Sequence, residues 1–484
     1  SGEPDDMDSH RQHLSRGFNW LGGATIVAKI IDFSTILVVL LFLTKEQVGI
    51  ASLVVSIGMI IEAFDGLGTA DALVQAPSIS RLQLDTLFWF VVGAAFAVAA
   101  VTLLAAPWIA AIYGVAGMAT YFLAIAAKQP LVAAAVIPLA IMNRDLRFER
   151  IAIVNVCATF GAAMTRLGLA IAGAGAWALV AGYTASGLFL LLGASLASPF
   201  LPRLRFQMRS IASLVHFGLR AGTSNVIEQV FKNVDYLLIG WFYGPAPLAI
   251  YRVAFDVAME PAMAIGTLVN RTALPVFAKM AAMREQLSQA FVWSVGRIAM
   301  LAAPLAVALI LVADPLMALL HDRQGHSYAA AALPLKLLAG AALLRIVAQI
   351  LYPLMMGSGR PGLAARLSAA TLTLLTAGIV AAGFSFPANA GVVAVSAVWF
   401  GVYPVLIIWG IRHLRIHWNI HIANFVPVFV SPAIGVCALA AMVETGRLFV
   451  ASGDLKIQVG LVLAATVLTY AGLILHHRRT MPAM

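Results

Sequence analysis

The chain alternates along its whole length between long apolar runs and short polar interruptions. One bilayer crossing by an α-helix takes about 20 apolar residues. Fourteen runs approach or exceed that length, at 17–43, 47–73, 85–106, 117–142, 151–172, 175–197, 211–242, 246–272, 288–312, 329–356, 363–383, 389–411, 423–443 and 456–476. The pattern therefore predicts an all-α polytopic membrane protein with 14 transmembrane helices.

Composition agrees with this pattern and excludes several other classes. Of the 484 residues, 62% are apolar and 11% are charged, whereas soluble domains carry roughly 25% charged residues. No polar stretch is long enough for a large catalytic domain outside the membrane. A transmembrane β-barrel would show short alternating strands instead of continuous apolar runs. Cys157 and Cys437 lie far apart inside apolar runs, so we expect neither a disulfide framework nor a metal site.

The basic residues outside the spans predict an orientation. With the N-terminus in the cytoplasm, the far side receives four of them, Lys45, Arg323, Arg447 and Lys456. The cytoplasmic side receives 17, which are Arg11, Arg16, Arg81, Arg144, Arg147, Arg150, Arg203, Arg205, Arg209, Arg271, Lys279, Arg284, Arg360, Arg412, Arg415, Arg478 and Arg479. This bias predicts an even number of spans with both termini cytoplasmic. It also explains most of the net charge of +10, so we expect no nucleic-acid partner.

A weak internal repeat relates the two halves of the chain. The segment 17–68 resembles the segment 218–266 at an offset of about 200 residues, as in transporters built from two structural repeats; a chance alignment of apolar helices is the alternative. We expect a tail at 1–15, a six-helix N-lobe at 16–200, a six-helix C-lobe at 201–415 and two further helices at 416–484. The lobes would be related by a pseudo-twofold axis along the membrane normal. Residues 1–6 precede Met7, and either an added segment or a native tail fits them.

Ten basic residues remain inside the predicted spans. They are Lys29, Lys128, Arg166, Arg220, Lys232, Arg252, Arg297, Lys336, Arg345 and Arg366. A charge at the bilayer centre costs roughly 2.5–3.5 kcal/mol on insertion scales, so these groups must face water, an anionic ligand or internal acids. Acidic residues lie close to several of them, namely Asp32, Glu62, Asp65, Asp71, Glu228, Asp235, Asp256 and Glu260.

The spacing of these charges predicts polar faces on particular helices. Arg252, Asp256 and Glu260 occupy positions i, i+4 and i+8, which form one narrow stripe on a helix. A broader polar face runs along the seventh span and contains Arg220, Ser224, Asn225, Glu228, Lys232 and Asp235. Such faces favour a wet central cavity. A cationic cavity suits a phosphate-bearing ligand, because Arg binds phosphate bidentately, whereas a cavity for organic cations should be acidic.

Several of these charges also have plainer explanations. Lys232 could be neutralised by Glu228 or Asp235 on its own helix, and Lys128 and Arg166 could fasten the first lobe internally. The acids Glu62, Asp65 and Asp71 could cap helices near the interface. Lys336 and Arg366 could snorkel to the membrane surface. For Arg220, Arg252, Arg297 and Arg345 we favour a role in the cavity.

Short motifs resemble a known family. The stretch from Asn233-Val234-Asp235 to Ile239-Gly240, followed by Leu248-Ala249-Ile250-Tyr251, is similar to the N-x-D-x-x-x-I-G and L-G-x-Y signature of polysaccharide flippases. Glu260-Pro261 and 270–277 continue the likeness, and Val48-Gly49-Ile50, Gly66-Leu67-Gly68, 72–75 and 85–89 resemble the first repeat. The family is the polysaccharide transporter, or oligosaccharide flippase, branch of the multidrug/oligosaccharidyl-lipid/polysaccharide (MOP) superfamily. Ala249 departs from the usual Gly and puts the geometry of that turn in doubt.

The resemblance implies a multi-pass flippase of the bacterial inner membrane and not an enzyme. Such a protein moves undecaprenyl-pyrophosphate-linked oligosaccharide repeat units from the cytoplasmic to the periplasmic leaflet for exopolysaccharide, O-antigen or capsule assembly. It implies two six-helix lobes that form a V-shaped cavity with alternating access. Its partners would be the lipid-linked oligosaccharide, membrane lipids and the polysaccharide polymerase and chain-length machinery.

Our hypothesis is that a set of basic residues neutralises the pyrophosphate. The set consists of Lys29, Arg220, Lys232, Arg252, Arg297 and Arg345. No cofactor or metal is expected, but H⁺ or Na⁺ coupling could involve an acid among Asp32, Glu228, Asp235, Asp256 and Glu260. A flippase for peptidoglycan lipid II and a cation-coupled multidrug exporter of the same superfamily are the alternatives. A membrane polymerase or ligase would need a long polar loop, and the longest outer loop, with His321, Asp322, Arg323 and His326, more simply reads as solvated.

Overall fold

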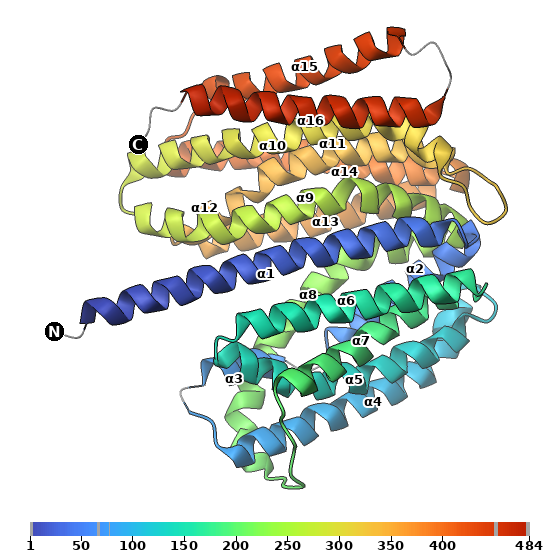
Figure 1. Ribbon diagram of the computed structural model, residues 1–484, viewed down its shortest axis with the longest axis vertical. Helices are drawn as coiled ribbons and strands as arrows, with labels where there is room; N and C mark the ends of the chain where they lie inside the picture. The colour runs from blue at the N-terminus through green and yellow to red at the C-terminus, as the bar shows by residue number, and fades with distance from the viewer. Residues whose placement is uncertain (1–2, 65–67, 77, 450–453, 481–484) are drawn as a thin grey trace. The chain divides into compact units, whose positions relative to one another are not determined.

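The computed structural model describes residues 3–64, 68–76, 78–449 and 454–480. Nearly all of these residues are helical, and no β-strand occurs within these ranges (Figure 1). The all-α class expected from the sequence is confirmed. The chain divides into two compact units, Ser1–Ala246 with Asp322–Gln324, and Pro247–His321 with Gly325–Met484.

Among the described residues, the first unit contains eight α-helices. These are α1 (Glu3–Leu40), α2 (Lys45–Glu62), α3 (Thr69–Gln75), α4 (Arg81–Tyr113), α5 (Met118–Arg144), α6 (Phe148–Ile171), α7 (Trp177–Ala197) and α8 (Met208–Tyr243). Helix α8 groups with this unit because it packs against α2, α3 and α4, whereas the repeat in the sequence placed it with the C-lobe. The lobe boundaries at 200 and 415 stay a prediction.

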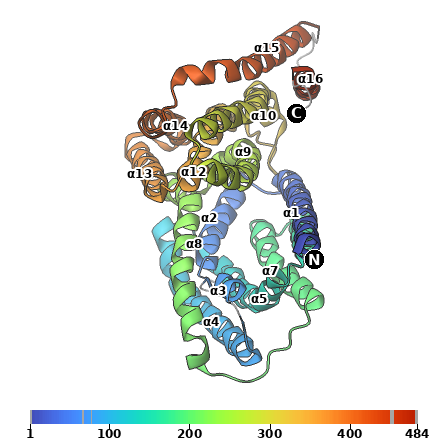
Figure 2. The same cartoon turned by 90° about the vertical axis from the view of Figure 1, so that its left-hand side faces the viewer.

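The second unit contains the remaining helices. These are α9 (Pro245–Met280), α10 (Arg284–Leu319), η2 (Ala329–Ala331), α11 (Ala332–Gln349), α12 (Leu351–Gly357), α13 (Pro361–Ser385), α14 (Ala388–Trp418), η3 (Ile422–Phe425), α15 (Val426–Phe449) and α16 (Leu455–Thr480). The last two long helices pack against α10 and against each other (Figure 2). Their shared core includes Val312, Leu439 and Val462.

Polar capping residues set several helix ends. The Thr44 side chain caps α2 by accepting from the backbone N–H of Gln47, whose own side chain accepts from the backbone N–H of Thr44. Ser80 and Gln83 form the same reciprocal pair at the start of α4. Each pair satisfies two backbone donors that a helix N-terminus leaves open. At the other end of α4, Gly114 takes a left-handed conformation with φ of 63°, which Gly adopts without steric cost.

The predicted span 47–73 is two helices in the structure. Helix α2 ends at Glu62, and α3 begins at Thr69 after Gly68, which has φ of 67°. The expectation of one continuous helix was wrong because left-handed Gly68 cannot continue a helix. The span 329–356 is likewise divided, into η2, α11 and α12.

Eleven helices of the described chain are long and apolar enough to cross a membrane. They correspond to eleven of the fourteen predicted spans. The other three predicted spans correspond to α2, α8 and α9, which contain ionisable residues in the middle or at both ends. The chain is a multi-pass membrane protein, and the total of fourteen stays a prediction.

Candidate functional site

Two basic residues are buried inside the first unit, and each meets an acid from another helix. Lys128 on α5 lies 2.7 Å from Glu62 on α2, and Arg166 on α6 lies 2.8 Å from Asp32 on α1. The side chains of the bases are 4% and 10% exposed, and those of the acids are 31% and 40% exposed. A buried charge needs a partner because the low-dielectric interior cannot solvate it. The prediction that Lys128 and Arg166 fasten the first lobe internally is confirmed.

Tyr183 on α7 completes the cluster around Lys128. Its hydroxyl donates to the same Oε2 of Glu62 that receives Lys128. The Lys128 ammonium also lies 3.3 Å from the centre of the Tyr183 ring, a cation–π arrangement that adds to the stabilisation. We call Glu62, Lys128 and Tyr183 the buried triad. Sequence reasoning missed it, since Glu62 was interpreted as a possible helix cap near the interface and Tyr183 was not singled out.

On α1, the two residues predicted for the site differ in their surroundings. Asp32, a predicted coupling acid, is the partner of Arg166. Lys29, a predicted phosphate ligand, is exposed. Asp65 and the Asp71 side chain lie outside the described residues.

Helix α8 carries its predicted polar residues in two environments. Glu228 and Lys232 form an ion pair of 2.5 Å, with side chains 59% and 45% exposed. This is the intrahelical pairing that the sequence left open. Asp235 is 1% exposed, and its Oδ1 accepts from the backbone N–H of Tyr236. The side chain of Arg220 lies outside the described part of the helix.

In the second unit, the stripe on α9 contains an ion pair. Arg252 Nε donates to Asp256 Oδ2 at 2.7 Å, and the two side chains are 20% and 13% exposed. Glu260 follows one turn later and is partly exposed. Because Arg252 and Asp256 neutralise each other, this turn of α9 presents little net charge.

Aromatic rings contact the other two predicted arginines of the second unit. The guanidinium of Arg345 on α11 lies 5.7 Å from the ring centre of Trp399 on α14. Trp399 also packs against Phe255 of α9 at 5.5 Å, so α9, α11 and α14 meet at this tryptophan. Arg297 on α10 lies 4.4 Å from the ring centre of Trp293, one turn before it on the same helix.

Local contacts shape the loop 320–328, which the sequence places on the outer side. His321 and Ser327 form a β-bridge, and Oδ1 of Asp322 accepts from the backbone N–H of Gln324. Among the residues that the structure describes, no group of three His, Cys, Asp or Glu side chains could hold a metal ion.

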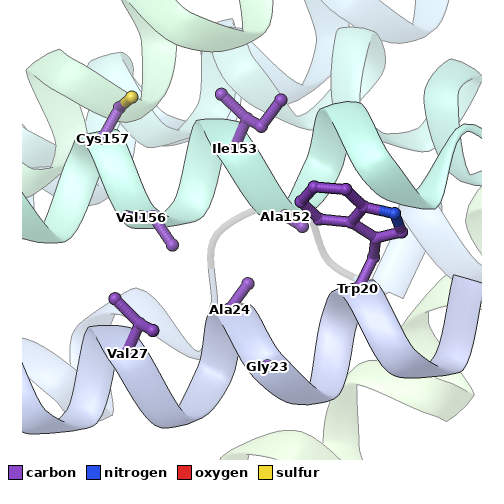
Figure 3. Close-up of a pocket in the computed structure, with 8 residues that line it drawn as sticks. All are labelled: Trp20, Gly23, Ala24, Val27, Ala152, Ile153, Val156 and Cys157. Carbon is purple, nitrogen blue, oxygen red and sulfur yellow. The ribbon is translucent and has the colours of Figure 1, made fainter.

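An apolar groove lies between α1 and α6 (Figure 3). Its volume is about 480 Å³, and its lining comprises Trp20, Gly23, Ala24, Val27, Ala152, Ile153, Val156 and Cys157. The small residues Gly23, Ala24 and Ala152 create the space between the helices, and the lining presents no charged group.

Comparison with known proteins gives a family and a fold. Residues 38–329 match the model of a family described as polysaccharide biosynthesis protein. The lipopolysaccharide biosynthesis protein WzxC of Escherichia coli (strain K12) is 23% identical over 386 residues, which cover 78% of this chain and 76% of the relative. The succinoglycan biosynthesis transport protein ExoT of Rhizobium meliloti (strain 1021) is 24% identical over 295 residues, 61% of this chain and 60% of the relative.

Two solved structures share the fold. The lipid II flippase MurJ in an inward closed conformation aligns with a TM-score of 0.72 at 11% identity, over 95% of this chain and 99% of that chain. An inward-facing multidrug resistance MATE family transporter of the MOP superfamily aligns with a TM-score of 0.58 at 15% identity, over 82% and 95%. The family resemblance seen in the motifs is confirmed, and the comparisons support transport over catalysis.

Proposed function

Since the chain belongs to the family of polysaccharide biosynthesis proteins, we propose that it is a flippase for lipid-linked oligosaccharides. In this proposal it moves undecaprenyl-pyrophosphate-linked repeat units from the cytoplasmic to the periplasmic leaflet of a bacterial inner membrane, by alternating access. The family match over residues 38–329 carries the proposal. The intramembrane bases support it, because a pyrophosphate needs neutralisation to cross an apolar barrier.

The proposed ligands of the pyrophosphate are Lys29, Arg220, Lys232, Arg252, Arg297 and Arg345. Arg345 is the best placed of those that the structure describes. Within the described residues its guanidinium makes no ion pair and lies 5.7 Å from the ring centre of Trp399. An aromatic face orients a guanidinium and leaves its N–H groups available for an anion. Lys232 and Arg252 share their charge with Glu228 and Asp256, so they contribute less net attraction.

Coupling to H⁺ or Na⁺ would use one of the acids Asp32, Glu228, Asp235, Asp256 and Glu260. Three of them, Asp32, Glu228 and Asp256, pair with a base. Protonation of such an acid would release its base, which links ion uptake to the charge available for the ligand. The membrane potential supplies about 2.3 kcal/mol per elementary charge per 100 mV.

The two alternatives share this fold. A lipid II flippase and a multidrug exporter both align with the chain, and the match to a polysaccharide family is what favours the oligosaccharide. The proposed partners are the lipid-linked oligosaccharide, membrane lipids and the polysaccharide polymerase and chain-length machinery.

The test is transport of a lipid-linked oligosaccharide in proteoliposomes. We expect Arg345→Gln to lower the flipping rate by roughly ten- to a hundredfold, because one charge-assisted contact is worth about 1.5–3 kcal/mol. Arg345→Lys should recover part of the rate, since the ammonium keeps the charge but lacks the planar fork. Lys336→Gln is the matched control, because it removes a base from the same helix, α11. Unlike Arg345, Lys336 already has a carboxylate partner, Asp314, at 2.6 Å.

The results of this assay distinguish the proposed function from its two alternatives. A wild-type rate for Arg345→Gln, or an equal loss for Lys336→Gln, would contradict the role given to Arg345. Transport of lipid II in preference to the oligosaccharide would favour the first alternative. Export of an organic cation with no lipid transport would favour the second.

A further inference from the structure

The stretch 323–443 contains no acidic residue. It contains seven Lys and Arg residues, which are Arg323, Lys336, Arg345, Arg360, Arg366, Arg412 and Arg415. Helices α13 and α14, which pack side by side (Figure 2), lie entirely within it. Basic residues on these two helices therefore have no carboxylate on their own or on the adjacent helix to neutralise them.

One exposed face of α14 is apolar along its second half and carries two arginines near the C-terminal end of the helix. Val405, Ile408 and Ile416 are 53%, 68% and 62% exposed, and Arg412 and Arg415 are exposed as well. At 100° per residue, these five positions fall within about 100° of the helix surface. A continuous strip of exposed apolar side chains on a membrane-spanning helix suits contact with lipid chains better than contact with a water-filled cavity, because apolar surface is costly to expose to water. The two arginines therefore end a lipid-facing strip, at the side of the membrane that the charge bias predicts to be cytoplasmic.

These two arginines differ from three arginines near the ends of α4 and α6. Arg147 pairs with Asp145 at 3.2 Å and Arg81 with Asp85 at 3.3 Å, while Arg150 donates to the backbone oxygen of Ala197. Within the described part of the chain, Arg412 and Arg415 have neither an ion pair nor a side-chain hydrogen bond. Their guanidinium groups are available to an external anion.

Arg360, at the same end of α14, lies on another side of the helix. Its Nη1 donates to Nδ1 of His417, and its guanidinium lies 5.4 Å from the ring centre of Trp418. His417 is separated from Arg415 by about 160° around the helix, counted the short way. Arg360 is thus held by α14 but does not belong to the strip.

We propose that Arg412 and Arg415, with the strip formed by Val405, Ile408 and Ile416, bind an anionic phospholipid. The lipid phosphate would accept hydrogen bonds from the two guanidinium groups, and an acyl chain would lie along the strip. Basic sites beside membrane helices at the cytoplasmic surface bind anionic headgroups in this way. This lipid site is independent of the proposed transport, and its occupancy is measured without a transport substrate.

The experiment is native mass spectrometry of the purified full chain titrated with phosphatidylglycerol or phosphatidylcholine that carry the same acyl chains. We expect the wild-type protein to bind phosphatidylglycerol more tightly. The double variant Arg412→Gln/Arg415→Gln should bind it about thirtyfold more weakly, from about 1 kcal/mol per basic residue near the surface. Its affinity for phosphatidylcholine should not change.

Two controls keep the test specific. Arg147→Gln/Arg150→Gln removes the same charge from another helix end, and Arg360→Gln removes an arginine beside α14 but outside the strip; both should keep the preference. Equal loss in either control, or no preference in the wild type, would overturn the proposal. Displacement of the lipid by inorganic phosphate alone would also overturn it, since it would indicate a site for a soluble anion.

Discussion

At the scale of single residues, the intramembrane bases are stabilised in two ways. Lys128 and Arg166 are almost fully buried and meet a carboxylate from another helix. Arg345 is partly buried, and its guanidinium lies 5.7 Å from the ring centre of Trp399. A carboxylate cancels the charge, whereas an aromatic face stabilises the cation and leaves its field in place. The first arrangement suits a structural role, and the second suits an anionic ligand.

The buried triad predicts an asymmetric response to mutation. Glu62→Leu leaves the Lys128 ammonium buried without its carboxylate and should lower the unfolding free energy by about 3 kcal/mol. Lys128→Met should cost less, because Glu62 is 31% exposed and keeps the Tyr183 hydroxyl. The double variant Glu62→Leu/Lys128→Met should be more stable than Glu62→Leu alone. The measurement is denaturant unfolding of the protein in detergent.

The order of the unfolding free energies of these three variants tests whether Glu62 stabilises the buried Lys128 ammonium. If Lys128→Met were the most damaging single change, or if the double variant were the least stable of the three, the carboxylate would not be what stabilises the buried ammonium. Tyr183→Phe provides a milder companion, since it keeps the ring near Lys128 and removes the hydrogen bond to Glu62.

Local pairs could be predicted from the sequence, and distant ones could not. Arg252–Asp256 and Glu228–Lys232 are four residues apart, and helical periodicity alone brings such side chains together. The partner of Lys128 is 66 residues away. Periodicity gives the helix face on which Lys128 lies but not the helix that packs against this face. The sequence therefore predicts that Lys128 needs an acidic partner, but it does not predict that this partner is Glu62.

At the scale of helices, glycines on α7 make room for the buried bases. A Cβ at Gly182 would lie 2.9 Å from Cβ of Arg166 and 3.2 Å from the backbone oxygen of Ala162. A Cβ at Gly187 would lie 3.0 Å from Cγ of Lys128. Small residues let membrane helices approach closely, and here they also admit the aliphatic stems of two charged side chains.

Gly182→Ala should therefore destabilise the protein by about 1–3 kcal/mol, the usual cost of overpacking. Gly93→Ala on α4 is the matched control, because a Cβ there meets no atom within 4 Å. It should stabilise the helix by about 0.5–1 kcal/mol, since Ala is the better helix former. Denaturant unfolding of both variants tests the prediction, and a stabilising effect of Gly182→Ala would refute the close packing of α6 and α7.

Helix boundaries follow the same logic. Most predicted spans coincide with one helix, because a long apolar run between polar turns has one good solution in a membrane. The span 47–73 does not, because Gly68 takes a left-handed conformation. Gly68 is visible in the sequence, but a glycine inside an apolar run is also compatible with a continuous helix. Tertiary packing decides whether the glycine continues the helix or ends it.

At the scale of the whole molecule, the number of crossings depends on three charged helices. Eleven helices of the described chain are apolar enough to cross a membrane by composition alone. Helices α2, α8 and α9 are 18, 36 and 36 residues long, so length permits them to cross. They contain the Glu228–Lys232 and Arg252–Asp256 pairs, and Glu62 of the buried triad. Internal pairing lowers the cost of placing those charges in the membrane.

Reporter fusions test whether these helices cross. With the N-terminus in the cytoplasm, an alkaline phosphatase fused after Thr44 should be active in the periplasm because α1 crosses, and one fused after Gly244 should be active there if α2 and α8 also cross. Fusions after Gln207 or Met283, or at the C-terminus, should be inactive, because both termini would lie in the cytoplasm with the basic loops. A green fluorescent protein at the same five positions is the complementary control and should give the opposite pattern. If the Gly244 fusion matched those at Gln207 and Met283, α8 and α9 would not cross, and the count would fall from fourteen to twelve. Both termini would still lie in the same compartment, so fusions at the termini cannot distinguish fourteen crossings from twelve. The Gly244 fusion therefore decides whether the charged helices α8 and α9 cross the membrane.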